Sequence, residues 1–257
     1  SSTVSWARNS VSLISHELRT PLTLIITPLD MMIRRLTDET MKKQLNTIYK
    51  NAQNLLSLVN QLLDFRKLEM KGERLHLMNG DMEEFIVSAY NNFMPMAVEK
   101  HLNFVNQSEH RALYMFFDRD KVHKIVNNLL SNAFKFTPEN GKIAVRLSSL
   151  NKEDKRWIRF TVANTGSMIS AEHIRNLLMC FYKIVMHHAG SGIGLALVKA
   201  FVEMHGGTIA VESDEKLGTI FTVELPVQSC ETVATEPDDI LVSPDSRTTD
   251  ILLTEEE

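Results

Sequence analysis

The sequence predicts two domains: an all-α helical hairpin over residues 1–72 that dimerises into a four-helix bundle, then an α/β sandwich over residues 73–228. Three observations predict this. The length of 257 residues suits two compact domains. Apolar residues recur at alternating three- and four-residue steps through residues 4–72, which is the pattern of packed helices. From residue 73 short strand-like runs alternate with helical stretches, which favours a mixed sheet with helices on one face.

Composition and charge narrow the class of protein. The chain is 44% hydrophobic and 23% charged, and its net charge is -4. Residues 229–257 hold nine acidic residues and one arginine, so we expect a disordered acidic tail or linker there. The first 228 residues carry 27 basic and 23 acidic side chains, a mildly basic balance that suits a nucleotide. No basic stripe with interleaved aromatic residues predicts nucleic-acid binding.

The apolar runs and the cysteines of the sequence indicate the cellular compartment to expect. No apolar run reaches the roughly 18 residues of a membrane span, and the first residues do not resemble a signal peptide. The two cysteines, Cys180 and Cys230, predict neither a disulfide framework nor a metal site, and they suggest a reducing compartment. We therefore expect a cytoplasmic location, with any membrane anchor outside these 257 residues.

The hairpin is predicted from a heptad pattern. A turn is expected at Thr37–Glu39, and the second helix should end before Gly72. Two prolines should bend the first helix. The apolar stripe is wider than a two-stranded seam requires, so two copies should pair into a four-helix bundle. The seam is expected at Val4, Ala7, Val11, Ile14, Leu18, Pro21, Ile25, Pro28 and Met32, then at Ile48, Ala52, Leu55, Val59 and Leu62.

The second domain is predicted from shorter patterns, with one sheet and an irregular connection over residues 165–192 that could be a lid. Strands are expected at residues 75–78, 102–105, 112–117, 142–149, 156–163, 207–213 and 219–225, and helices at 81–98, 118–136 and 193–205.

The string Ser15-His16-Glu17-Leu18-Arg19-Thr20-Pro21-Leu22 carries the first candidate site. His16 falls opposite the heptad seam, where a neutral imidazole is exposed and can act as a nucleophile. Thr20 lies one helical turn later on the same face. On position alone, a solvated surface histidine is the more common explanation.

A second candidate lies in the helix over residues 118–136. Asn128, Asn132 and Lys135 share one face, where amide oxygens suit Mg²⁺ and an ammonium suits phosphate. From spacing alone, a solvated polar face explains them equally well. A third candidate is the glycine run Gly190-Ser191-Gly192-Ile193-Gly194-Leu195-Ala196, which opens a predicted helix and would let a phosphate approach the backbone. A simple turn before a helix explains this run as well.

Together, and in this order, these strings resemble the boxes of sensor histidine kinases over residues 5–227. The resemblance implies that His16 accepts phosphate from ATP, that Glu17 takes its proton, and that Thr20 assists dephosphorylation of a partner. It implies Asn132 as a Mg²⁺ ligand, Asn128 and Lys135 near the phosphates, and Phe136 by the adenine or ribose. Further nucleotide contacts are implied for Asn164, Gly166, Gly190, Gly192, Gly194, Leu195 and Thr219.

The resemblance also implies a homodimer and a response-regulator receiver domain, separate or fused, which accepts the phosphoryl group on an aspartate. The full-length protein would be a membrane-anchored bacterial sensor with this part on the inner side. One box departs from the pattern: Asn164-Thr165-Gly166-Ser167-Met168 replaces Asp-x-Gly-x-Gly. An amide loses the charge assistance of a carboxylate, and methionine replaces a glycine. Two hypotheses follow: an active kinase, or a degenerate dimeric relay that binds ATP weakly or not at all.

Overall fold

In the computed structural model the chain divides into two compact units, Ser1–Glu73 and Arg74–Glu257. The structure describes residues 2–69, 73–109, 111–166, 192–214, 218–228 and 240–242, and only the backbone of residues 2–18, 69, 192 and 240–242. The connection expected to be a lid lies outside the described residues from position 167 to 191, and Met168 lies there too. No helix among the described residues is long and apolar enough to cross a membrane.

The first unit is a helical hairpin of α1 (Ser2–Arg35) and α2 (Glu39–Glu69). The turn falls where the sequence predicts it, because the Asp38 carboxylate accepts hydrogen bonds from the backbone N–H groups of Thr40 and Met41 at 2.8 and 3.2 Å. Pro21 and Pro28 lie inside α1, which continues through both as one helix.

The described part of the hairpin has two apolar faces instead of one. Along the first, where α1 and α2 pack together, the side chains are half-buried; they include Leu22, Ile26, Leu29 and Ile33 of α1 and Leu45, Tyr49, Leu56 and Val59 of α2. Along the second, the side chains are exposed; they are Pro21, Ile25, Pro28 and Met32 of α1 and Met41, Ile48, Leu55 and Leu62 of α2.

Most described positions of the predicted heptad lie on this second face. The seam expected through Ile25 and Met32 is exposed, and the contact between α1 and α2 runs through the neighbouring apolar positions. In α2 the predicted seam splits, since Ala52 and Val59 are half-buried whereas Ile48, Leu55 and Leu62 are exposed. The stripe is wide enough for two seams, and the contact between α1 and α2 uses one of them.

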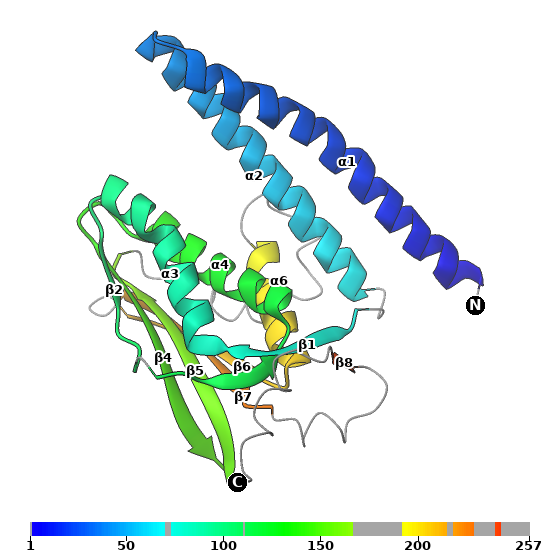
Figure 1. The fold of residues 1–257 in the computed structure, drawn as a ribbon, viewed down its shortest axis with the longest axis vertical. Helices are drawn as coiled ribbons and strands as arrows, with labels where there is room; N and C mark the ends of the chain where they lie inside the picture. Colours follow the sequence, from blue (N-terminus) through cyan, green and yellow to red (C-terminus); the bar gives the residue numbers. More distant parts are fainter. Residues whose placement is uncertain are drawn as a thin grey trace, which may run out of the picture. The chain divides into compact units, whose positions relative to one another are not determined.

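The second unit is built on a five-stranded mixed sheet of order β2-β4-β5-β7-β6. Only β2 and β4 are parallel, and the other neighbours are antiparallel. The helices described in this second unit lie together on one face of its sheet, as Figure 1 shows. The strands are β2 (Asn103–Asn106), β4 (Lys142–Lys152), β5 (Lys155–Asn164), β6 (Thr208–Asp214) and β7 (Gly218–Pro226), and the helices are α3 (Met82–Glu99), α4 (Arg119–Phe136) and α6 (Gly192–Met204).

Strands β1 (Leu75–Asp81) and β3 (Tyr114–Phe117) pair with each other instead of joining the five strands, so the expectation of one sheet is wrong. A third strand, β8 (Ile240–Val242), runs parallel to β1 in this small sheet. It lies within the tail that was expected to be disordered. The correction has a local cause, because Ile-Leu-Val is an apolar, largely β-branched run that suits a strand.

Buried and accessible side chains alternate along β4 and β5, so one face of the sheet forms the core and the other face is open. Ile143, Val145 and Leu147 of β4 are buried beneath the helices. The opposite face carries mostly small side chains, such as Ala144 and Thr161. It also carries Glu224, which pairs with Lys152 and Arg159. Burial would raise the pKa of Glu224, but hydrogen bonds from these two cations hold the pKa below its ordinary value.

Candidate nucleotide and phosphoacceptor sites

Helix α4 presents a polar stripe beside its buried face. Ile125, Leu129 and Ala133 are buried, whereas Asn128 and Asn132 are half-buried and Lys135 is exposed. The amide nitrogen of Asn128 donates to the Lys124 carbonyl at 2.8 Å, which leaves the amide oxygen as an acceptor. The three polar residues are therefore accessible to a ligand from one side of the helix.

The C-terminal end of α4 is held rigidly. The Thr137 hydroxyl and backbone N–H both donate to the Ala133 carbonyl, at 2.6 and 3.0 Å, which closes the last turn. Just before this cap, the Phe136 ring is 41% exposed, and the Lys135 ammonium lies 5.2 Å from its centroid. An exposed ring beside an ammonium suits a flat base next to a phosphate chain.

Two glycines let three separate segments meet at this end of α4. Gly166 follows β5 with a φ of 126°, and an added Cβ would lie 2.7 Å from the Phe136 carbonyl oxygen. Gly218 opens β7 with a φ of 79°, and a Cβ there would overlap the carbonyl oxygen of Asn164. The ends of α4, β5 and β7 thus lie in close contact only because both positions lack a side chain.

Asn164 occupies the centre of this junction and is 6% exposed. Its amide nitrogen donates to the Thr165 carbonyl at 3.3 Å, and no described donor reaches its amide oxygen. In the next strand Thr219 lies directly opposite Asn164, and the Thr219 hydroxyl lies 2.9 Å from that of Ser213. The arrangement offers one buried acceptor next to a pair of hydroxyl groups.

The second glycine run is described from Gly192, which begins α6. Gly194 and Leu195 are buried in its first turn. The unpaired N–H groups of a helix N-terminus favour an anion, so this end of α6 suits a phosphate. Gly190 lies outside the described residues.

On the hairpin, α1 includes His16 and Glu17, whose side chains lie outside the described part. At about 100° per residue, position 16 lies on the same face of α1 as Thr20 and Thr23, both exposed. By this spacing, the face that carries position 16 points away from the two apolar faces of the hairpin.

The junction fits an adenine nucleotide by the chemistry of its donors and acceptors. The oxygen of Asn164 can accept from an exocyclic amino group, Phe136 can cover a ring, and Lys135 can meet a phosphate. Among the described residues no group of three or more His, Cys, Asp or Glu side chains could hold a metal ion. Amide oxygens are also suitable ligands for a divalent cation such as Mg²⁺. Asn132, which has no hydrogen bond within the described chain, is available for this.

Sequence reasoning missed several residues that build the site. Thr165 exchanges hydrogen bonds with Lys142, its hydroxyl accepting from the Lys142 N–H at 2.8 Å, and so fixes the loop after β5. Asp118, Lys121 and His205 form a buried cluster at the other end of α4. Asp118 could have been found as the helix N-cap, but nothing local marks His205 as its neighbour.

Two family matches cover the two units. Residues 7–71 match the His Kinase A (phospho-acceptor) domain. Residues 117–229 match the Histidine kinase-, DNA gyrase B-, and HSP90-like ATPase family. Fold and site therefore define a class in which a phospho-acceptor hairpin is joined to an ATPase domain.

Curated relatives agree with this class. The chain is 35% identical to Histidine kinase P4 of Formosa agariphila, over 83% of this chain and 16% of that protein. It is 33% identical to Hybrid signal transduction histidine kinase D of Dictyostelium discoideum, over 83% of this chain and 14% of the relative. It is 29% identical to Sensor histidine kinase WalK of Bacillus subtilis, over 85% of this chain and 36% of that protein. The chain thus spans only a minor part of each relative, and it belongs to the sensor histidine kinases of two-component systems as their kinase core.

Solved structures share the fold. Full-length ShkA in complex with AMPPNP matches with a TM-score of 0.69 at 24% identity, over 86% of this chain and 46% of that one. The catalytic domain of histidine kinase ThkA matches with a TM-score of 0.51 at 25% identity, over 60% of this chain and 97% of the other. The expectation of a helical hairpin followed by an α/β kinase domain is confirmed.

Proposed function

We propose that the chain transfers the γ-phosphoryl group of ATP to His16 and then passes it to an aspartate of a response-regulator receiver domain. One observation carries the nucleotide half of the proposal. Gly166 and Gly218 let the ends of α4, β5 and β7 meet, which gathers Phe136, Asn164 and Thr219 from distant parts of the sequence.

The nucleotide would be bound by residues of this junction. The amide oxygen of Asn164 accepts from the base, Phe136 lies against the base or ribose, and Lys135 and Asn128 meet the phosphates. Asn132 would hold Mg²⁺, which when bound supplies positive charge next to the phosphate oxygens. The N-terminus of α6, with Gly192, Gly194 and Leu195, would add backbone donors, as would Gly190 before it.

The acceptor half rests on position 16 of α1. A neutral imidazole on the exposed face can approach a phosphate in line, and Glu17 takes the proton that the imidazole loses. Phosphoryl transfer depends mainly on position and on neutralising charge, so the ATPase unit has to be brought onto the hairpin. Thr20, one turn further and exposed, would position water when the phosphorylated partner is hydrolysed.

The exposed apolar face of the hairpin supports a homodimer. Its members on α2, Met41, Ile48, Leu55 and Leu62, repeat every seven residues, which is the spacing of a helical-bundle seam. A second copy would cover this face and complete a four-helix bundle. In a longer protein this core would follow a sensor region, on the inner side of a membrane if that region is anchored there.

The proposal is tested by transfer in two steps. The chain is incubated with Mg²⁺ and γ-labelled ATP, freed of nucleotide, and mixed with a purified receiver domain. We expect labelling of the chain, then movement of the label to the receiver, and no labelling of a receiver whose acceptor aspartate is replaced by alanine. A chain that binds no nucleotide and takes up no label supports the degenerate relay instead.

A further inference from the structure

A buried cluster of three charged or polar side chains lies at the N-terminal end of α4, far from the nucleotide junction. Asp118 and Lys121 form an ion pair with Oδ2 3.0 Å from Nζ, and both side chains are 3% exposed. His205, 3% exposed, joins them from the residue after α6. Burying an ion pair is costly, so the cluster needs further partners to be retained.

Those partners are the first residues of the ATPase unit. The Lys121 ammonium donates to the Arg74 carbonyl at 3.0 Å, and the His76 N–H donates to the Asp118 carboxylate at 2.9 Å. Arg74 is the residue at which the second unit begins. The helix therefore holds the backbone at the point where this unit is joined to the hairpin.

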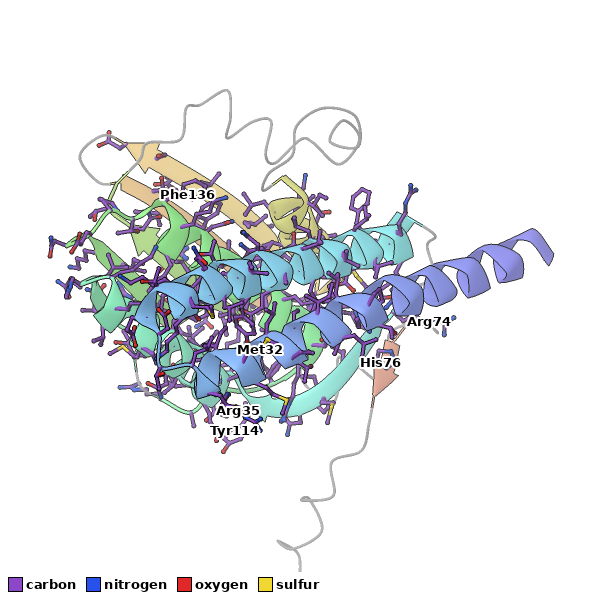
Figure 2. All side chains as sticks on the ribbon, turned by 90° about the horizontal axis from the view of Figure 1, so that it is seen from above. Met32, Arg35, Arg74, His76, Tyr114 and Phe136 are labelled. Atoms are coloured by element: carbon purple, nitrogen blue, oxygen red, sulfur yellow. The ribbon has the colours of Figure 1, made fainter. Side chains whose placement is uncertain are left out.

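The same cluster also holds α6. The backbone N–H of Asp118 donates to Nε2 of His205 at 3.2 Å, and Nδ1 of His205 lies 2.7 Å from the Phe201 carbonyl of α6. Helix α4 bears the candidate nucleotide residues toward its other end, and α6 begins at the second glycine run. In the ATPase unit, Figure 2 shows Phe136 well away from Arg74 and His76.

We propose that Asp118, Lys121 and His205 form a clamp that fixes Arg74–His76 to α4 and α6, and that they are positioning residues for phosphoryl transfer to His16. The inference rests on the proposed function. The clamp joins Arg74–His76, α4 and α6 into one rigid piece. A movement that reaches Arg74 from the hairpin therefore also moves the bound nucleotide. Without the clamp, Arg74 and the start of β1 are no longer fixed to α4 and α6, although Leu75 stays buried in β1, so the γ-phosphate reaches His16 at a lower effective concentration.

The test is a double variant, Asp118→Asn with Lys121→Met. It removes both charges together, so neither is left buried and unpaired. Asparagine still caps α4, but its single amide oxygen cannot cap the helix and also accept from His76. Methionine fills the space of the lysine stem and loses the bond to Arg74. The matched control, Glu224→Gln with Lys152→Met, removes the ion pairs that Glu224 makes with Lys152 and Arg159, away from the clamp.

We expect three results for the clamp variant. Its affinity for a fluorescent ATP analogue with Mg²⁺ stays within about twofold of wild type. Its single-turnover rate of His16 labelling falls on the order of tenfold or more, because a small misplacement of reacting groups has a large effect on rate. Amide hydrogen exchange in the segment Arg74–Leu77 becomes faster. The control variant matches wild type in all three.

A clamp variant that labels His16 as fast as wild type overturns the inference and leaves the proposed function standing. An equal loss of nucleotide affinity and rate also overturns it, because the cluster would then only support the ATP site. A wild-type chain that takes up no label overturns the proposed function together with this inference. If this double variant does not fold, Asp118→Asn with Lys121→Gln replaces it with the same expectations, because it also removes both charges and glutamine is one atom too short to reach Arg74.

Discussion

The backbone N–H of Asp118 donates a hydrogen bond to Nε2 of His205, a side chain 87 residues further along the chain. The bond fixes the tautomer of His205, because an Nε2 that accepts a hydrogen bond carries no proton. The proton is then on Nδ1, which donates to the Phe201 carbonyl. His205 is therefore neutral in the folded protein, and protonation at Nε2 would set two N–H groups against each other.

This arrangement predicts a pH dependence of stability. Burial lowers the pKa of His205, and the Lys121 charge adds to this, although the Phe201 carbonyl and Asp118 act in the opposite direction. Free histidine has a pKa of about 6.5, so in acid the unfolded chain takes up the proton first. The contribution of His205 to the free energy of unfolding should fall as pH drops below about 6.5, with a slope of at most about 1.4 kcal/mol per pH unit for this one group. Urea denaturation at pH values between 7.5 and 5 measures the free energy of unfolding.

A variant pair isolates this contribution. In His205→Gln the free energy of unfolding should fall less steeply between pH 6.5 and 5.5, since glutamine does not titrate. His76→Gln removes a histidine from the exposed surface and serves as the control. An unchanged slope in His205→Gln would show that other groups cause the pH dependence.

Gly218 and Gly206 test the close approach at the nucleotide junction. Both have a positive φ, 79° and 72°, but a Cβ at Gly218 meets the Asn164 carbonyl, whereas one at Gly206 meets only Pro226 at 3.6 Å. Gly206→Ala should cost about 1 kcal/mol from its backbone conformation alone. Gly218→Ala should cost about 2–4 kcal/mol and weaken nucleotide binding. Thermal unfolding compares the two, and equal losses would refute the packing argument.

Leu55 tests the second seam of the hairpin. Leu55→Glu places a charge on the exposed apolar face of α2, so the dimer should dissociate at concentrations where wild type is dimeric. Ser57→Glu is the control, because position 57 is exposed and lies more than half a turn away around the helix. Sedimentation velocity gives the masses. A Leu55→Glu chain that remains dimeric would place the interface elsewhere.

Asn164 tests base recognition. Asn164→Ala removes the buried acceptor while α4 and β7 keep their contacts, so ATP affinity should fall about five- to thirtyfold, as for loss of one hydrogen bond. Thr161→Ala, three residues earlier in β5 and on the open face of the sheet, should leave affinity unchanged. Fluorescence titration measures both. If the two variants bind alike, Asn164 does not contact the base.

The sequence predicts helices and most strands because their signals are local. Asp38 and Asp118 begin helices as N-caps, and much of β4 and β5 alternates buried residues with more accessible ones. The sequence does not say which seam of the hairpin is used within the chain, because the apolar stripe is wide enough for two seams. Burial in the structure separates Ile26 from Ile25, which periodicity alone could not.

Pairing between distant segments is the other feature that the sequence does not predict. Nothing near β1 indicates that it pairs with β3 and β8 instead of joining the larger sheet. Likewise Asp118 and His205 meet only because α4 and α6 pack side by side, and His205 has no local signal. The candidate nucleotide residues can be predicted because their boxes resemble those of the family, whereas supporting residues such as Thr165 are visible only through their contacts.

The central claim is that His16 accepts phosphate from ATP, and mapping the labelled residue tests it most directly. After incubation with Mg²⁺ and ATP, the chain is digested under alkaline conditions and its phosphopeptides are sequenced by mass spectrometry. We expect an acid-labile, alkali-stable phosphate on His16, absent from His16→Gln although that variant still binds ATP. Phosphate on another residue, or equal labelling of His16→Gln, would contradict the account.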